Sequence, residues 1–252
     1  MGSGKVSFGL DSNSLLRACW PVPAHIHLVT TLRSQGFSAE SYQDFNLATH
    51  VDDSAEHVQK NRRILSELLQ VKKDPFWVNQ VHGTEVLEAR HSEALLDADA
   101  SFADESQQIC VVLTADCLPV AFYNESNDRI AVAHAGWRGL ASGILEATLR
   151  ALGPGRTHTW LGPAIGPDHF EVGMDVVDAF VRPDPSLVSA FTARDAIHWG
   201  ADLYALAKAK LMRAGVVSVS GGGWCTYCDA TRFYSFRRDR ITGRMATCIW
   251  KD

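Results

Sequence analysis

The sequence predicts one α+β domain with helices outside its β-sheets, and three observations favour this class. The apolar run at 110–114, rich in β-branched residues, is typical of a buried strand, and several other segments have a similar composition. Segments such as 54–69 instead place apolar residues on one face of a helix. The chain has 252 residues, 46% of them hydrophobic, which suffices to bury one sizeable core.

Charge and composition narrow the classes of partner. The formal net charge is −5, and the Lys and Arg residues are scattered along the chain. This distribution argues against a nucleic-acid or membrane-surface partner. The sequence has no run of about 18 apolar residues, and residues 1–14 are polar where a signal peptide would be apolar. We therefore expect a cytoplasmic protein.

We divide the chain into an N-terminal segment, 1–24, and a single domain, 25–252. The N-terminal segment is weakly patterned, and Pro21 and Pro23 keep it extended. The apolar segment 25–32 that follows predicts a strand. A long loop rich in polar and small residues comes next, and long loops often carry function.

A helix is predicted over 54–69. Asp53 followed by Glu56 fits a capping box at its start. The apolar residues of this segment fall on one face, so Asn61 and Arg62 are expected to be partly exposed.

A hairpin is predicted after this helix. The segments 76–81 and 84–89 have strand composition, and the dipeptide between them has turn composition. His82 would then lie at the hairpin tip. Residues 91–108 are acidic and polar, and we expect them to form a connecting loop.

The centre of the chain predicts a strand, turn, strand unit. The apolar segments 117–123 and 129–135 are joined by polar turn residues. If these strands pair, Cys117 and His134 lie close together at one end. Gly136 follows directly, where bare backbone leaves room for a ligand.

The rest of the chain predicts both helices and strands. Helical spacing predicts helices over 138–152, 175–182 and 201–215. Apolar segments predict strands over 158–162, 216–220, 233–239 and 244–250.

His82, Cys117 and His134 together offer two imidazoles and one thiolate. They are three protein ligands for Zn²⁺, with a fourth position left for water, as in catalytic zinc sites. The set contains no local ligand motif, so its assembly depends on the fold. From spacing alone the alternative stays open that each histidine is a structural residue and the cysteine a core residue.

The six cysteines are sparse and irregularly spaced. In a reducing compartment such cysteines are core residues, ligands or nucleophiles more often than disulfides. Cys225 and Cys228 form a CTYC pair that could bind a metal, but no second CxxC completes a four-ligand site. Structural packing is therefore the favoured interpretation of this pair.

Several motifs in order resemble the YfiH-like family, known as the polyphenol-oxidase or laccase-domain family and as purine nucleoside phosphorylases. The motifs are NQVHGTEV, TADCLPV, HAGWRG, LGPAIGP, CTYC with FYSFRRD, and GRMA. The resemblance runs from about Arg33 to Trp250, nearly the whole chain. It implies mixed sheets packed as a sandwich with surrounding helices, and a zinc site made of His82, Cys117 and His134.

The resemblance further implies phosphorolysis of adenosine, inosine and S-methyl-5'-thioadenosine, with adenosine deamination as a related activity. Phosphorolysis requires cations for phosphate, and Arg33 and Arg62 are candidates because guanidinium binds phosphate bidentately. Structural ion pairs are an equal alternative for both. Deamination requires a carboxylate that moves a proton. Asp116 or, more weakly, Glu171 could supply it, although strand alternation would point Asp116 away from Cys117.

Two other functions stay open. A site of two histidines and one cysteine also suits a single Cu²⁺, and this would make a copper-dependent polyphenol oxidase. Alternatively, Cys117 as nucleophile and His134 as base would make an amide hydrolase. The family's fold is similar to that of a deamidating toxin with such a dyad, and some members are tied to the editing of peptidoglycan precursors.

The sequence departs from the family pattern at two places. Asp168 and His169 stand where many relatives carry Cys or another residue, so the position of His169 relative to the site is open. Gln35 stands where relatives commonly have a second glycine. The sequence also leaves the oligomeric state open.

Overall fold

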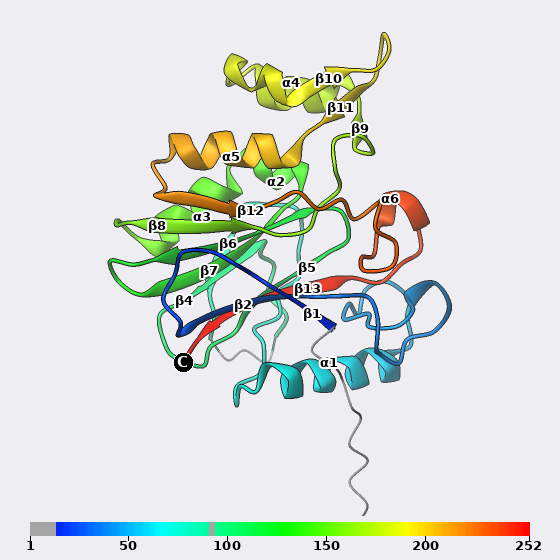
Figure 1. Ribbon diagram of the computed structural model, residues 1–252, viewed down its shortest axis with the longest axis vertical. Helices are drawn as coiled ribbons and strands as arrows, with labels where there is room; N and C mark the ends of the chain where they lie inside the picture. Colours follow the sequence, from blue (N-terminus) through cyan, green and yellow to red (C-terminus); the bar gives the residue numbers. More distant parts are fainter. Residues whose placement is uncertain (1–13, 91–93) are drawn as a thin grey trace, which may run out of the picture.

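The computed structural model describes residues 14–90 and 94–252. Two β-sheets pack face to face at the centre of this part of the chain (Figure 1). The core between them takes Cys110 and Ile249 from one sheet and Ala121 and Ile130 from the other, all buried. The α+β class and the packing of β-sheets as a sandwich are therefore confirmed, and the larger of the two sheets is mixed.

The larger sheet has the strand order β12-β8-β6-β7-β4-β3. Its strands are β12 (Ser218–Gly221), β8 (Thr157–Leu161), β6 (Leu118–Asn124), β7 (Arg129–Ala135), β4 (Ala100–Ala103) and β3 (Val86–Glu88). The two outer pairs are parallel and the inner ones antiparallel, so the sheet is mixed. The predicted pairing of the two central strands is confirmed, with Leu118 opposite Ala135.

The second sheet is antiparallel, in the order β1-β2-β13-β5. Its strands are β1 (Leu15–Arg17), β2 (Ile26–Thr31), β13 (Met245–Lys251) and β5 (Cys110–Thr114). The strands predicted from segments 25–32, 110–114 and 244–250 are confirmed. The N-terminal segment also contributes, because β1 pairs with β2.

Helices cover the outer faces of both sheets (Figure 1). The helices of the described chain are α1 (Ala55–Leu69), α2 (Trp137–Ser142), α3 (Ile144–Leu152), α4 (Met174–Val181), α5 (Leu203–Arg213) and α6 (Phe236–Asp239). Leu65 of α1 packs under the second sheet, and Leu145 of α3 and Leu206 of α5 pack on the larger one. No helix within the described ranges is long and apolar enough to cross a membrane.

A small sheet with α4 lies beyond α5 (Figure 1). Its strands are β9 (Glu171–Val172), β10 (Phe191–Ala193) and β11 (Trp199–Ala201), in the order β10-β11-β9. Two short 3₁₀ helices, Glu40–Tyr42 and Pro185–Ala190, complete the described structure. β10 and β11 were not predicted from the sequence, because neither run is long or strongly apolar.

The capping box predicted at Asp53 is wrong. Ser54 is the N-cap of α1 and accepts a hydrogen bond from the His57 amide. Asp53 instead accepts hydrogen bonds from Ser38 and Asn46 within the preceding loop. The loop uses this carboxylate, so the neighbouring serine caps the helix.

Asn61 was predicted to be partly exposed, and this is also wrong. Its side chain is fully buried, and its amide donates to Ser38 Oγ and to the carbonyl oxygens of Asp44 and Asn46. It faces the long loop before the helix. Its hydrogen bonds tie that loop to α1, which the helical spacing could not reveal.

The hairpin predicted around His82 does not form. Residues 76–81 make only isolated bridges, at Phe76 and Asn79, and β3 pairs in parallel with β4. The backbone amides of this bend bind the Asp99 carboxylate instead of a neighbouring strand. The connecting loop predicted over 91–108 is also wrong in part, because it contains the strand β4. Residues 91–93 of this segment lie outside the described residues.

Two further element predictions are wrong. The helix predicted over 138–152 is divided into α2 and α3 by Gly143, whose φ of 100° lies in the left-handed region. The strand predicted over 233–239 contains α6, for which Ser235 is the N-cap. Local hydrogen bonds therefore override the apolar composition of this segment.

Candidate metal centre

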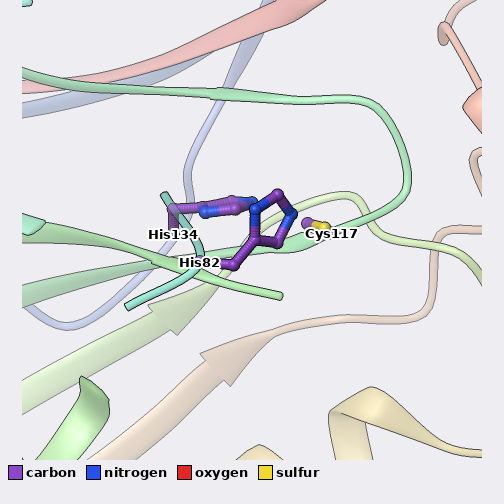
Figure 2. Close-up of side chains that lie close together, drawn as sticks. All are labelled: His82, Cys117 and His134. Carbon is purple, nitrogen blue, oxygen red and sulfur yellow. The ribbon is translucent and has the colours of Figure 1, made fainter. Parts of the chain in front are cut away.

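Three potential metal ligands converge at one end of β6 and β7 (Figure 2). Cys117 directly precedes β6 and His134 lies next to the end of β7, where the antiparallel register places Pro119 opposite His134. His82 approaches from the bend before β3. One ligand atom from each residue lies within 4.8 Å of the other two.

The three potential ligands differ in their exposure to solvent. His134 is buried, Cys117 is half-buried and His82 is exposed. The imidazole rings of the two histidines meet edge to face, with their centroids 4.8 Å apart. A small molecule would therefore reach the sulfur from the His82 side.

Asp99, a residue that sequence reasoning did not single out for the site, positions both histidines. Its buried carboxylate lies 2.8 Å from Nδ1 of His134. It also accepts hydrogen bonds from the backbone amides of Val81, His82 and Gly83. His82 itself has a left-handed φ of 60°, which these bonds stabilise.

The contact with Asp99 assigns the tautomer of His134. A carboxylate accepts, so Nδ1 carries the proton and Nε2 is left as the metal-binding nitrogen. Metal-bound histidines commonly make such a second bond to a carboxylate. An aspartate in a predicted loop gives no sequence signal of this role.

Gly136 provides the space in which the ligands meet. A Cβ atom at this position would lie 3.0 Å from Cys117 Sγ and 3.0 Å from His82 Cδ2. Both distances are tighter than ordinary contacts, so a side chain would displace the ligands. The expectation that Gly136 leaves room beside the site is confirmed.

The electrostatics of the site favour a thiolate. Burial alone would raise the pKa of Cys117, but the charges and hydrogen bonds of His134 and His82 lower it below its usual value. Burial would likewise lower the pKa of His134, but the Cys117 thiolate and Asp99 raise it. Thiolate and neutral imidazole are the forms that bind Zn²⁺, so the donor set fits this metal.

Arg62 and Arg33, the two phosphate candidates, have different surroundings. The Arg62 guanidinium stacks over Trp77, 3.8 Å from the ring centroid, and donates to the Leu47 carbonyl. Burial lowers the pKa of Arg62 to about 10. Arg33 lies over the ring of Tyr234 and donates to two backbone carbonyls, which are structural contacts.

Sequence reasoning missed Arg244, whose positive charge interacts with the negative charge of Cys117. Burial lowers its pKa, and the negative charges of Cys117 and Asp116 oppose that effect. Burial lowers the pKa of His50, and the positive charges of Arg244 and Arg62 lower it further. Both arginines therefore lie near His50, and Arg62 belongs to α1. The only sequence signal of Arg244 is its place in the GRMA motif.

The two carboxylate candidates are engaged elsewhere. Asp116 accepts hydrogen bonds from Thr226 Oγ1, at 2.6 Å, and from the Arg237 amide, at 2.7 Å. The Glu171 carboxylate lies 3.9 Å from Arg194. Both contacts are structural.

Among the described residues, Cys225, Cys228 and His169 do not belong to a group of three potential ligands. His169 stacks on Tyr227 with ring centroids 4.1 Å apart. Within residues 14–90 and 94–252, His82, Cys117 and His134 form the one group of three side chains close enough to share a metal.

A model of one protein family matches residues 27–252, almost the whole chain. Its description is multi-copper polyphenol oxidoreductase laccase. The chain belongs to this family. The resemblance stated from the motifs is therefore confirmed.

Two curated proteins are similar to this chain over nearly their full length. A protein of Pseudomonas aeruginosa is 47% identical over 94% of this chain and 98% of its own, and is named a purine nucleoside phosphorylase. The purine nucleoside phosphorylase YfiH of Escherichia coli is 42% identical over 92% of this chain and 96% of its own.

Solved structures of similar proteins share the fold. A protein of Neisseria meningitidis superposes with a TM-score of 0.92 at 44% identity, covering 95% of this chain and 99% of its own. YlmD of Geobacillus stearothermophilus superposes with a TM-score of 0.87 at 30% identity, covering 96% and 97%.

Proposed function

We propose that this chain is a zinc-dependent purine nucleoside phosphorylase. Its substrates would be phosphate and adenosine, inosine or S-methyl-5'-thioadenosine. The observation that carries the proposal is the group of His82, Cys117 and His134, with Asp99 orienting His134. The relatives named purine nucleoside phosphorylases support it, since they match nearly the whole chain.

His82, Cys117 and His134 would hold the metal. When bound, Zn²⁺ supplies a Lewis acid that stabilises negative charge developing in the site. Three protein ligands leave room for such chemistry, because structural zinc sites use four.

The residues around the ligands perform the remaining tasks. Phosphate attacks C1' of the ribose as the purine leaves, so a cation must hold the anion in line with that bond. Arg244 is our leading candidate for this, because its charge interacts with that of Cys117. Like Arg33, it also donates to two backbone carbonyls, those of Thr242 and Gly243. Arg62 adds a second positive charge near Arg244, since both lower the pKa of His50. Arg33 keeps its place as a weaker candidate.

Adenosine deamination would be a second activity at the same site. It requires a group that carries a proton between the attacking water and the leaving amine. Asp116 would have to exchange one of its two hydrogen bonds to do so. For this reason we rank deamination below phosphorolysis.

One observation favours an amide hydrolase as a second candidate function. Without metal, the lowered pKa of Cys117 and the adjacent His134 give a thiolate and imidazolium pair, as in cysteine nucleophiles. The oxidase in the family description would require Cu²⁺ at the same three ligands. A single copper there would transfer electrons more naturally than reduce oxygen.

Metal analysis with a phosphate-dependent assay tests the proposal. About one zinc per chain, with free purine and ribose 1-phosphate formed only when phosphate is present, is the expected result. Ammonia release from amides without phosphate would favour the hydrolase, and oxygen consumption with copper would favour the oxidase. The cytoplasmic location stays a prediction, which cell fractionation tests.

A further inference from the structure

We propose that Cys225 and Cys228 form a reversible disulfide, and that the turn between them transmits this change to Asp116, the neighbour of Cys117. The pair lies outside the three metal ligands. The first part of the proposal does not depend on the proposed function, whereas the second part rests on the proposed metal site.

The turn holds the two sulfurs next to each other. The Asp229 amide donates to the Cys225 carbonyl over 3.1 Å, which closes one helical turn over residues 225–229. Side chains three residues apart on such a turn are neighbours. The Cys228 amide accordingly donates a hydrogen bond to Cys225 Sγ over 3.4 Å.

Cys225 is the nucleophile of the pair. Its Sγ accepts hydrogen bonds from the amides of Gly166, at 3.3 Å, and Cys228, at 3.4 Å. The hydrogen bond to Cys225, with burial and nearby negative charges, raises the pKa of Cys228. Cys228 therefore stays a thiol and resolves the reaction.

Both sulfurs are accessible to a reagent. Cys228 is exposed and Cys225 is half-buried, whereas Cys110 and Cys248 are buried in the core. A zinc site is the other use of a CxxC pair. The part of the chain that the structure describes offers no third ligand within reach of this pair. The pair is therefore a dithiol.

The oxidant belongs to the class of hydroperoxides or small disulfides. With a hydroperoxide, the Cys225 thiolate attacks one peroxide oxygen, the O–O bond breaks, and an alcohol or water leaves. The resulting sulfenic acid condenses with the Cys228 thiol, which forms the S–S bond and releases water. Two thiols are oxidised and one peroxide is reduced by two electrons.

Thr226, between the two cysteines, connects the turn to the metal centre. It is fully buried, and its hydroxyl donates to the Asp116 carboxylate over 2.6 Å. Its amide donates to the Ala164 carbonyl, and the amide of Ile165 donates to the Asp116 carbonyl. A disulfide holds its two Cβ atoms about 3.5–4.5 Å apart, and so constrains the backbone at Thr226, which lies between the two cysteines.

Thiol counting in redox buffers tests the disulfide. The zinc-loaded Cys19→Ser protein would be equilibrated with reduced and oxidised glutathione, quenched in acid, alkylated and weighed intact. This background removes the exposed Cys19. We expect Cys225 and Cys228 to lose alkylation together, with the loss of two hydrogens. In Cys228→Ser, Cys225 should instead carry one glutathione.

Two results would overturn the disulfide. The first is that both cysteines stay fully alkylatable in oxidised glutathione, or that each of them takes up its own glutathione molecule. The second is a second zinc per chain that is lost in Cys225→Ser/Cys228→Ser, since that would make the pair a metal site.

Zinc transfer to a coloured chelator tests the connection. Its rate should change severalfold between the reduced and oxidised protein, and the change should disappear in Thr226→Val. Thr226→Ser keeps the hydroxyl and should preserve the change. Equal rates in both redox states, with the disulfide formed, would overturn the connection to Asp116 while leaving zinc binding itself intact.

Discussion

The Asp99 carboxylate lies 2.8 Å from Nδ1 of His134, and both side chains are buried. The same carboxylate accepts the backbone amides of the His82 bend. One buried anion therefore orients one ligand through its ring and another through its backbone. This explains how two histidines far apart in the sequence meet at one cysteine.

Asp99→Asn should weaken zinc binding by about 10- to 100-fold, the usual effect of losing a carboxylate that orients a metal-bound histidine. The physical reason is that His134 loses its charged partner and the His82 bend loses one of its acceptors. Zinc competition with a chelator measures it. Asp97→Asn is the matched control, because Asp97 is exposed and contacts Asn79 instead. Equal zinc affinity in the two variants would show that Asp99 does not orient the ligands.

Gly136→Ala should weaken zinc binding, because the new Cβ would press on Cys117 and His82. Overpacking of this kind costs about 1–3 kcal/mol, or roughly 5- to 150-fold in affinity. Gly83→Ala is the control, since its Cβ would meet its nearest atoms at 3.5 Å. Zinc titration measures the affinity of both variants. A normal affinity in Gly136→Ala would show that a Cβ at this position does not displace the ligands.

In the metal-free protein, Cys117 should react with iodoacetamide at neutral pH faster than an ordinary cysteine. The thiolate reacts, and the pKa of Cys117 is lowered, so its reactivity stays high as the pH falls through the usual cysteine pKa of about 8.5. It is lost only below the lowered pKa. Peptide mapping of the alkylated protein across pH measures this.

Two controls belong to the alkylation experiment. His134→Ala should move the reactivity of Cys117 back toward higher pH, because the main charge that lowers its pKa is gone. Bound zinc should protect Cys117 until a chelator removes it. A Cys117 that is labelled equally fast with zinc present would contradict its assignment as a ligand.

Arg244→Ala should raise the KM for phosphate by about 10- to 100-fold, the loss expected for hydrogen bonds to a charged group. Zinc content should not change. Arg150→Ala, which removes an exposed arginine of α3, should leave the KM unaltered. Steady-state kinetics at varied phosphate distinguishes these outcomes. An unchanged KM in Arg244→Ala would contradict its role in phosphate binding and would favour Arg62 or Arg33 instead.

The sequence contained enough information for the central strands and for the meeting of Cys117 with His134. Continuous apolar runs identify buried strands, and a short polar turn between two of them implies antiparallel pairing. The His82 bend could not be predicted, because its backbone binds Asp99 rather than a strand. The same limit applies to Asn61, whose hydrogen-bond partners are distant in the sequence.

Phosphate-dependent release of ribose 1-phosphate from adenosine tests the central claim most directly. The zinc-loaded protein should form free adenine and ribose 1-phosphate in equal amounts, with a rate that saturates with phosphate. Cys117→Ala should be folded, free of zinc and inactive. Adenine release that does not depend on phosphate, or full activity in Cys117→Ala, would contradict zinc-dependent phosphorolysis at this site.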